Sequence, residues 1–306
     1  MTITEQSGND LVDYPIRVEI TDPQFFEECP DQKYIECYFQ DGSWIPHFTE
    51  EFDPAHNKAV IWVKVPQIPA NGTVKVFIKV NPSRTEDLSN GEAIFEWFDD
   101  FSDGLTKWTA DSDIYVDNGV LVVPSKDVHY YKLESAQTID MVGVINKAIE
   151  MRVKIVGAEG GGAVWNIGWV SGSDIYASRH SYKTTRSFDL CVYGYNGSLV
   201  AEQCGYDDQH QNGVWYSFSL RNVPGKLMLY DYALGATLIV TDSYFSTLSM
   251  AKIGIGRWTV GGTLYIDWIG VRKYVDPEPT VSVEYVSETV TYTDYFYWGM
   301  AKMLSG

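Results

Sequence analysis

Strict alternation of apolar and polar residues is the feature that most constrains how this chain folds. In PIRVEI, Ile16, Val18 and Ile20 fall on one face, and Arg17 and Glu19 fall on the other. TVKVFIKV and IEMRVKI alternate in the same way. A period of two with one polar face is typical of antiparallel strands that pack on a single side. Turn signals such as IPANG and NVPG separate the runs, and no amphipathic helix of normal length is evident. The sequence predicts an all-β protein with two β-sandwich domains.

Composition marks two domain boundaries. One is a polar segment between residues 82 and 91, and the other is DPEP at 276–279, whose prolines stop a central strand. The tail that follows alternates and then turns aromatic. Three interpretations of this tail are open: a strand that docks back on a domain, a partner-binding segment, or the point at which a longer protein has been truncated. We predict a first domain at 1–83, a linker at 84–94, a second domain at 95–275 and a linker with an aromatic tail at 276–306.

Length and charge exclude several classes of protein. The chain has 306 residues, of which 45% are apolar, so it can bury the cores of two domains. A net charge of −18 argues against partners that are nucleic acids or anionic membranes. No apolar run approaches the roughly 20 residues of a transmembrane helix. The polar start MTITEQSGND is no signal peptide, and we expect that an earlier segment has been removed.

The four cysteines fall into two close pairs, Cys29 with Cys37 and Cys191 with Cys204. The second pair flanks VYGYNGSLVAEQ, which predicts a hairpin around its Asn-Gly turn. Neither pair has the spacing of a zinc site, and no histidine lies close by. We expect disulfides in preference to four free thiols, and therefore an extracytoplasmic setting.

The first part of the chain resembles a known family. TITEQSGNDLVDYPIRVEI, KAVIWVKVPQIPANGTVKVFIKVNPS and SNGEAIFEWFDDF are similar to domain of unknown function 2341, over roughly residues 1–83. The resemblance implies a surface-exposed or secreted protein of several modules, of bacterial, archaeal or viral origin. Family members commonly begin with an additional aromatic and basic segment, which is missing here.

The second part resembles the jelly-roll modules of the concanavalin-like or laminin-G-like kind. The resemblance rests on the paired ends FDDFSDG and YIDWIGVRKY. It implies that the first and last strands lie side by side, that the module binds sugars or proteins, and that it holds a structural calcium.

Three aspartates in these paired ends form a candidate calcium site. On a strand, Asp99 shares a face with Phe95 and Trp97, and Asp267 shares a face with Tyr265. A carboxylate on an apolar face needs its charge met, and calcium prefers such oxygen ligands. We therefore predict a site that combines Asp99 or Asp100 with Asp267. The alternative is that these aspartates accept backbone hydrogen bonds or face water.

The segment from residue 165 to 190 and the stretch GRWTVGG supply the candidate ligand-binding residues. Sugar recognition needs flat aromatic faces together with planar polar groups. The alternative is that the tryptophans belong to the core and that the cations balance nearby acidic residues. The candidate residues are Trp165, Trp169, Tyr176, Arg179, His180, Tyr182, Arg186, Arg257 and Trp258.

The sequence offers no residue-level support for catalysis. Sandwich glycoside hydrolases need two carboxylates at fixed separation, and no ExDxxE run or G-x-S-x-G motif is present. The sequence favours a non-catalytic, lectin-like, calcium-binding module that binds glycans or a surface protein. Such a module would act as an adhesin or a component of a cell or virion surface. The alternatives are a concanavalin-like glycoside hydrolase or lyase, and a structural assembly component that self-associates through aromatic residues 292–298.

Overall fold

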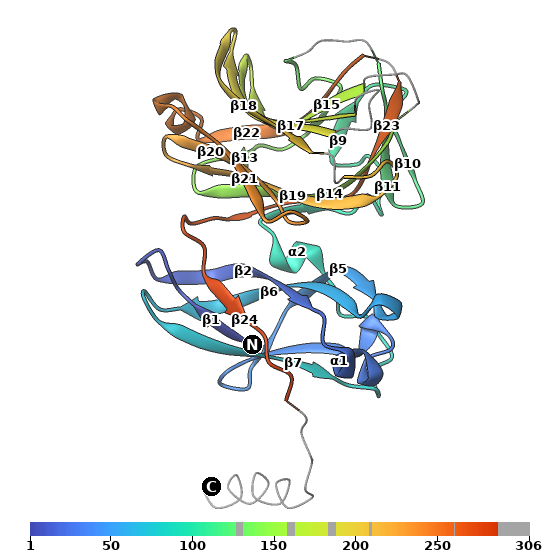
Figure 1. The fold of residues 1–306 in the computed structure, drawn as a ribbon, viewed down its shortest axis with the longest axis vertical. Coiled ribbons are helices and arrows are strands. Elements are labelled where there is room, and N and C mark those ends of the chain that lie inside the picture. The colour runs from blue at the N-terminus through green and yellow to red at the C-terminus, as the bar shows by residue number, and fades with distance from the viewer. Residues whose placement is uncertain (127–130, 158–162, 183–187, 208–209, 260, 287–306) are drawn as a thin grey trace, which may run out of the picture.

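The computed structural model describes residues 1–286 except 127–130, 158–162, 183–187, 208–209 and 260. It confirms the all-β prediction, with two β-sandwiches stacked along the long axis of the molecule (Figure 1). The predicted aromatic tail at 292–298 lies outside the described residues. In the part of the chain that is described, no helix has the length and apolarity needed to span a membrane.

The first sandwich consists of a five-stranded sheet, in the order β24-β1-β7-β3-β4, and a three-stranded sheet, β2-β6-β5. Its alternating strands bury Ile16, Val18 and Ile20 as predicted. Two short helices follow Asp22 and Asp31, whose carboxylates accept backbone N–H groups as N-caps. The strands are β1 (Thr2–Thr4), β2 (Leu11–Ile20), β3 (Ile35–Phe39), β4 (Trp44–Ile45), β5 (His47–Asp53), β6 (Lys58–Ile68), β7 (Thr73–Val80) and β24 (Thr280–Ser282). The helices are α1 (Pro23–Glu28) and the 3-10 helices η1 (Gln32–Tyr34) and η2 (Pro54–His56).

The second sandwich, a jelly roll, consists of two eight-stranded sheets around one large apolar core. The sheet next to the first domain, the near sheet, has the order β10-β11-β23-β14-β19-β20-β21, with β8 paired to β23. The other sheet, the far sheet, has the order β18-β17-β16-β15-β22-β12-β9, with β13 paired to β22. As the resemblance implied, the strands at the two ends of this domain, β8 and β23, lie side by side.

The elements of this domain are mostly strands. The shorter ones are β8 (Trp97–Asp99), β9 (Trp108–Ala110), β10 (Tyr115–Asp117), β11 (Val120–Pro124), β12 (Ala136–Thr138), β13 (Val142–Gly143), β20 (Lys226–Asp231), β21 (Ala236–Thr241) and the 3-10 helix η3 (Ser243–Ser246). The longer ones are β14 (Lys147–Gly157), β15 (Ala163–Ser171), β16 (Asp174–Tyr182), β17 (Phe188–Asn196), β18 (Leu199–Asp207), β19 (Trp215–Val223), β22 (Met250–Trp258) and β23 (Gly262–Lys273).

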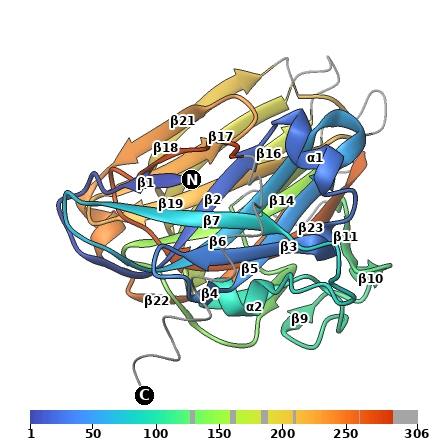
Figure 2. The ribbon, with the colours of Figure 1, turned by 90° about the horizontal axis from the view of Figure 1, so that it is seen from below.

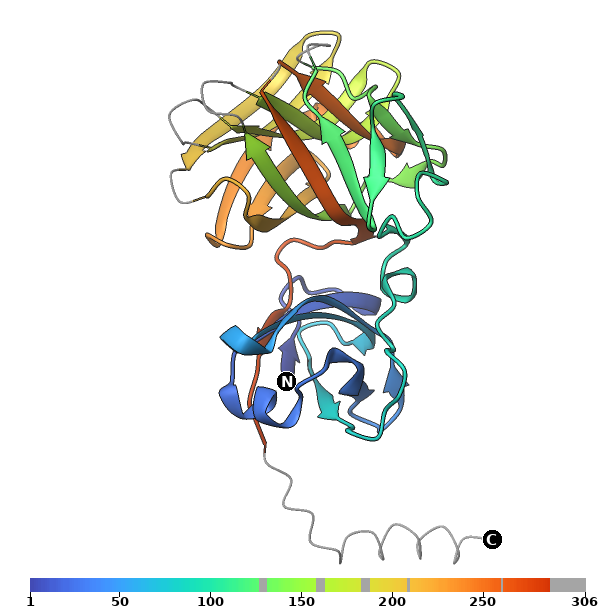
Figure 3. The same ribbon diagram turned by 90° about the vertical axis from the view of Figure 1, so that its right-hand side faces the viewer.

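The chain crosses between the domains twice (Figure 3). The first crossing contains α2 (Gly91–Ile94), inside the segment predicted to be a linker. This segment is packed, because Ile94 and Phe95 are buried in an aromatic cluster with Trp62 and Trp268. After the second crossing, β24 pairs with β1, so the start of the predicted tail is an edge strand of the first domain.

A buried ionic network joins the outer face of the near sheet to the sheet β2-β6-β5, which lies over it in the view of Figure 2. Arg272 donates to Glu150 at 2.7 Å, and the two side chains are 1% and 0% exposed. Arg272 also donates to Glu278 at 2.6 Å and to the Tyr14 hydroxyl of the first domain at 3.3 Å. Burial alone would raise the pKa of Glu278, but Arg272 and Arg221 outweigh it and hold that pKa low. The charged groups are therefore paired at neutral pH, as burial requires.

A second pair from the first domain completes the network. Arg17 contacts Glu50 through two nitrogens, each at 3.0 Å. Glu50 also accepts hydrogen bonds from Trp62 at 2.8 Å and from Ser217, on the second domain, at 2.5 Å. The Arg17 guanidinium lies 4.0 Å from the centre of the Tyr232 ring of the second domain. Because each contact has a fixed direction, the network sets how the two sandwiches are oriented.

Removal of one charge from this network has a predictable result. Glu150→Gln leaves the buried Arg272 with one carboxylate fewer, and we expect it to lower the free energy of unfolding by roughly 3 kcal/mol. Urea denaturation measures this. The matched control is Glu92→Gln, at an exposed pair with Lys107, which should change stability by less than about 0.5 kcal/mol. Equal effects of the two substitutions would contradict this account.

Candidate functional site

The outer face of the far sheet is the broad sheet face that lies away from the first domain (Figure 1). We call it the distal face. Its central row of side chains follows from strand register: Cys204 pairs with Cys191, Cys191 with Arg179, Arg179 with Asn166, and Asn166 with Gly256. Each of the strands β18, β17, β16, β15 and β22 therefore contributes one of its two faces to this surface.

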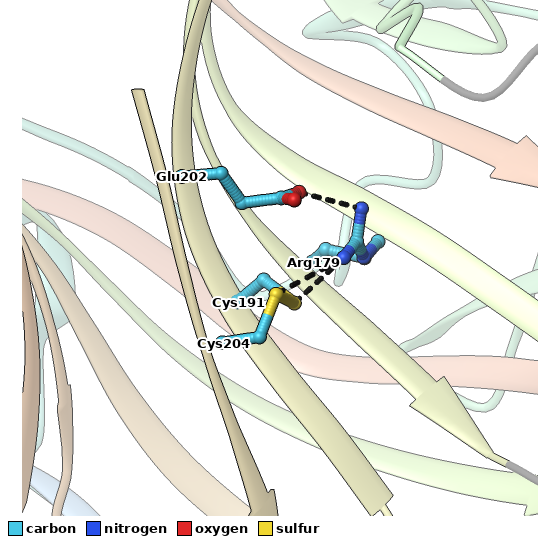
Figure 4. Close-up of a disulfide and its surroundings, with 4 residues drawn as sticks. All are labelled: Arg179, Cys191, Glu202 and Cys204. Carbon is cyan, nitrogen blue, oxygen red and sulfur yellow. Dashed lines mark hydrogen bonds and ion pairs between the residues drawn. A yellow bond between two sulfur atoms is a disulfide. The ribbon is translucent and has the colours of Figure 1, made fainter. Parts of the chain in front are cut away.

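Arg179 is the charged centre of the distal face. Its guanidinium forms an ion pair with Glu202 at 2.8 Å and lies 2.7 Å from the sulfur of Cys191 and 3.2 Å from that of Cys204 (Figure 4). Cys191 and Cys204 form a disulfide between directly paired positions of β17 and β18. The Arg179 side chain is 9% exposed, so these contacts fix its planar donor group at the surface of the sheet.

Three tyrosines lie on the same face. The rings of Tyr131 and Tyr195 stack with centres 5.1 Å apart, and the ring of Tyr193 meets Tyr131 edge-on at 5.3 Å. Tyr193 is buried, while Tyr131 and Tyr195 are half-buried. Burial raises the pKa of Tyr131, so its hydroxyl remains a neutral donor at physiological pH. The result is an aromatic surface beside a fixed Arg–Glu pair.

Two glycines decide how much of the distal face is open. A Cβ on Gly256 would overlap the carbonyl oxygen of Lys132, and one on Gly254 would lie 2.6 Å from that of Leu133. The chain therefore crosses directly over β22 at these residues. The crossing also covers part of the sheet beyond β22, because Leu133 and Tyr131 pack in one cluster with Ala177 and Tyr193, whereas Glu202 and Cys204 of β18 are exposed.

Most of the predicted ligand-binding residues instead belong to the core, which corrects the prediction. Trp165, Trp169 and Tyr176 are fully buried between the two sheets. They alternate with the outward residues of β15 and β16, so strand geometry directs them inward. The indole of Trp165 donates to the Val123 carbonyl at 3.2 Å, and the Tyr176 hydroxyl accepts from the Leu248 N–H at 3.1 Å.

Two of the predicted cations also point inward. His180 is 1% exposed, its ring 4.8 Å from that of Phe218. Arg257 is 0% exposed and pairs with Asp111 at 2.6 Å and Asp113 at 2.7 Å. Both groups have partners inside the fold: Ser178 lies 3.0 Å from the His180 ring, and both Nη atoms of Arg257 donate to aspartates.

The other predicted ligand residues have different positions. Arg179 and the partly exposed Trp258 lie on the distal face. Arg186 lies outside the described residues, and only the backbone of Tyr182, at the end of β16, is described. Sequence reasoning missed Tyr193, Tyr195 and Glu202, although the alternation in CVYGYN, across the predicted hairpin, was the signal that could have found them.

The three aspartates predicted to bind calcium each have partners within the protein. Asp99 accepts the Trp108 indole N–H at 2.7 Å and the Phe101 N–H at 3.0 Å, and burial raises the pKa of its carboxyl. Asp100 is exposed and accepts from Ser102, and Asp267 pairs with Arg152 at 2.7 Å. Among the described residues, one group of three possible metal ligands lies within 4.8 Å of one another: Cys191, Glu202 and Cys204. The two cysteine sulfurs of this group are bonded to each other as a disulfide.

The other predicted disulfide is absent. Cys29 and Cys37 are free thiols, buried in the core of the first domain. Cys29 donates to the Asp31 carbonyl at 3.4 Å, at the end of α1, and burial raises the pKa of its thiol to about 12. Burial likewise raises the pKa of Cys37, so both groups act as small apolar side chains.

Comparison with known proteins gives one family match. A family model described as "Domain of unknown function (DUF2341)" matches residues 31–111. This confirms the predicted resemblance over residues 31–83, and the match extends past the predicted bound, through the first crossing and β9. No curated protein matches the chain.

Several solved structures resemble the chain in fold. One is the CBM2 module of the evolved Dit of Lactobacillus casei BL23 phage J-1, with a TM-score of 0.46 and 11% identity, covering 61% of this chain and 96% of that one. Another is an endo-β-1,3-glucanase from Pyrococcus furiosus, with a TM-score of 0.45 and 12% identity, covering 60% and 95%. A third is a Bacillus licheniformis β-glucanase, with a TM-score of 0.44 and 12% identity, covering 58% and 97%. At such scores they bear on neither the activity nor the ligand of this chain.

The buried position of His180 predicts a pH dependence. Burial, with a further contribution from His210, lowers the pKa of His180 from 6.5 to about 3. The unfolded chain therefore binds a proton between pH 6.5 and 3 that the folded chain does not. Stability is fully present above pH 6.5 and falls as the pH drops, by up to a few kcal/mol.

Urea denaturation at pH 7 and pH 4.5 measures this slope. His180→Gln should reduce the loss of stability between the two pH values. Ser178→Ala is the matched control, because it removes the hydroxyl 3.0 Å from the His180 ring but keeps the titrating group. An unchanged pH slope in His180→Gln would contradict the assignment.

Calcium binding stays a prediction of the sequence, and thermal unfolding tests it. If it holds, calcium raises the melting temperature relative to a chelator, and Asp267→Ala removes the rise. Asp117→Ala, at an exposed aspartate on β10, is the control and should retain it. A melting temperature that is the same with calcium and with chelator would contradict the prediction of calcium binding.

Proposed function

We propose that this protein is a non-catalytic, extracellular recognition module that binds glycans through the distal face. The observation that carries the proposal is the aromatic surface of Tyr131 and Tyr195 beside the fixed pair of Arg179 and Glu202. Sugar rings pack their C–H faces on aromatic rings, and their hydroxyls form hydrogen bonds with planar polar groups. A face that combines both has the chemistry of carbohydrate recognition.

The arrangement of the domains supports this role. The first domain covers the near sheet through the ionic network, so the distal face points away from it (Figure 1). We infer that the first domain presents the second on a cell or virion surface, in the manner of an adhesin. The disulfide between Cys191 and Cys204 fits an oxidising, extracytoplasmic setting.

The distal face offers little for hydrolysis. Strands β15 to β18 and β22 direct one described carboxylate outward, that of Glu202. This carboxylate is paired with Arg179. Glycoside hydrolysis needs an acid and a second carboxylate on opposite sides of the bond. The arrangement therefore favours recognition over the glycoside hydrolase or lyase alternative.

A glycan array, with and without calcium, tests the proposal. We expect binding by the wild-type protein and a loss of about tenfold or more in affinity for Tyr195→Ala, from the removal of one stacking ring. The matched control is Tyr115→Ala, at a tyrosine 52% exposed on β10, which should bind normally. An absence of array binding, or equal loss in both variants, would contradict the proposed face. Release of reducing ends from a polysaccharide would favour the enzyme alternative.

A further inference from the structure

The junction between the two domains contains a half-open pocket of about 280 Å³, which we call the junction pocket. This is at the small end of the roughly 300–1,000 Å³ of pockets for drug-sized ligands, so it suits a smaller molecule. The pocket lies on the opposite side of the second domain from the distal face. Its lining includes Arg17, Trp62, Arg221, Tyr232, Arg272 and Val281.

The wall of this pocket is positively charged, in a chain whose net charge is −18. Three arginines line it, and Glu278 is the single carboxylate among the lining residues. Glu50 and Glu150 are not among the lining residues; their side chains, 1% and 0% exposed, pair with Arg17 and Arg272 and hold them in place. The ionic network therefore presents its cationic side to the pocket.

Each of the three arginines retains one guanidinium nitrogen for a ligand. The contacts of Arg17 use Nε and Nη2, those of Arg221 use Nε and Nη2, and those of Arg272 use Nε and Nη1. The remaining nitrogens, Nη1 of Arg17, Nη1 of Arg221 and Nη2 of Arg272, have no partner among the described residues. None of these three atoms is fully buried. Three N–H donor groups with residual accessibility thus belong to the wall of one pocket.

Aromatic rings hold these guanidiniums in fixed positions. Arg17 lies 4.0 Å from the centre of the Tyr232 ring, and Arg221 lies 4.2 Å from that of Tyr230. Arg272 lies 5.2 Å from the Trp62 ring. Planar arginine groups that are already ordered lose little entropy when they bind, and they match the geometry of oxyanions.

We propose that the junction pocket binds a small molecule that carries a carboxylate or a sulfate group, with Arg17, Arg221 and Arg272 as the anion ligands. Arg17 comes from the first domain and the other two from the second, so the bound anion bridges the domains. The rings of Tyr230, Tyr232 and Trp62 give the rest of the ligand an apolar surface. The site is independent of the proposed glycan-binding face, and each can fail without the other.

Isothermal titration calorimetry of the full chain tests this site, with sulfate, glucuronate and the neutral sugar glucose as probes. We expect the wild-type protein to bind sulfate or glucuronate but not glucose, at an ionic strength held constant with chloride. Arg221→Gln should weaken binding by about tenfold, because it removes a charged donor. Val281→Phe, which fills the pocket and keeps all three arginines, should also weaken it.

Arg152→Gln is the matched control. Arg152 lies on the same near sheet, is 18% exposed and pairs with Asp267, but it does not line the pocket. Binding that is retained in this variant and weakened in the other two supports the site. Absence of binding of both anions, equal binding of glucose and glucuronate, or wild-type affinity in both pocket variants would overturn it.

The position of the anion gives a readout that does not depend on how well a variant folds. Wild-type crystals soaked in selenate should show its anomalous signal within hydrogen-bond distance of Arg17 and Arg221. Selenate bound only elsewhere on the protein would overturn the proposal.

Discussion

The buried ion pair between Arg272 and Glu150 is the interaction on which the arrangement of this protein depends. Both side chains are almost fully buried, so each charge must be met by the other and by further hydrogen bonds. Those bonds come from both domains: Ser219 and Tyr232 on one side, and Tyr14 on the other. A purely apolar junction would tolerate sliding of one sheet over the other. This network, whose contacts are directional, specifies one orientation.

The aromatic cluster beside the network supplies the apolar part of the same junction. Trp62 and Trp268, from different domains, meet edge-on with ring centres 6.5 Å apart, and Phe95 of the first crossing packs against both. Their burial is a hydrophobic contribution that the ion pairs alone would not provide. Because the near sheet is covered in this way, the distal face is the broad sheet surface of the second domain left for a partner.

Alternation predicted which residues form the two cores, and it did so correctly for Ile16 and Ile149. It failed for the opposite faces of the same strands. Arg17 and Glu150 are on the polar faces of their strands but are held at the junction, because period two cannot tell a solvated face from one that another domain covers. Trp165 and His180 were misassigned for a related reason: aromatic and basic residues resemble a binding site in sequence whether a strand directs them inward or outward. The three-arginine pocket could not be predicted, because it combines residues far apart in the chain.

The central claim is that the two sandwiches form one cooperative unit through the buried network. Differential scanning calorimetry of the full chain tests this most directly, by comparing the calorimetric enthalpy of unfolding with the van't Hoff enthalpy. A single transition in which the two enthalpies agree is the result this account predicts. Two separate transitions, or a calorimetric enthalpy about twice the van't Hoff value, would show that the domains unfold independently and would contradict it.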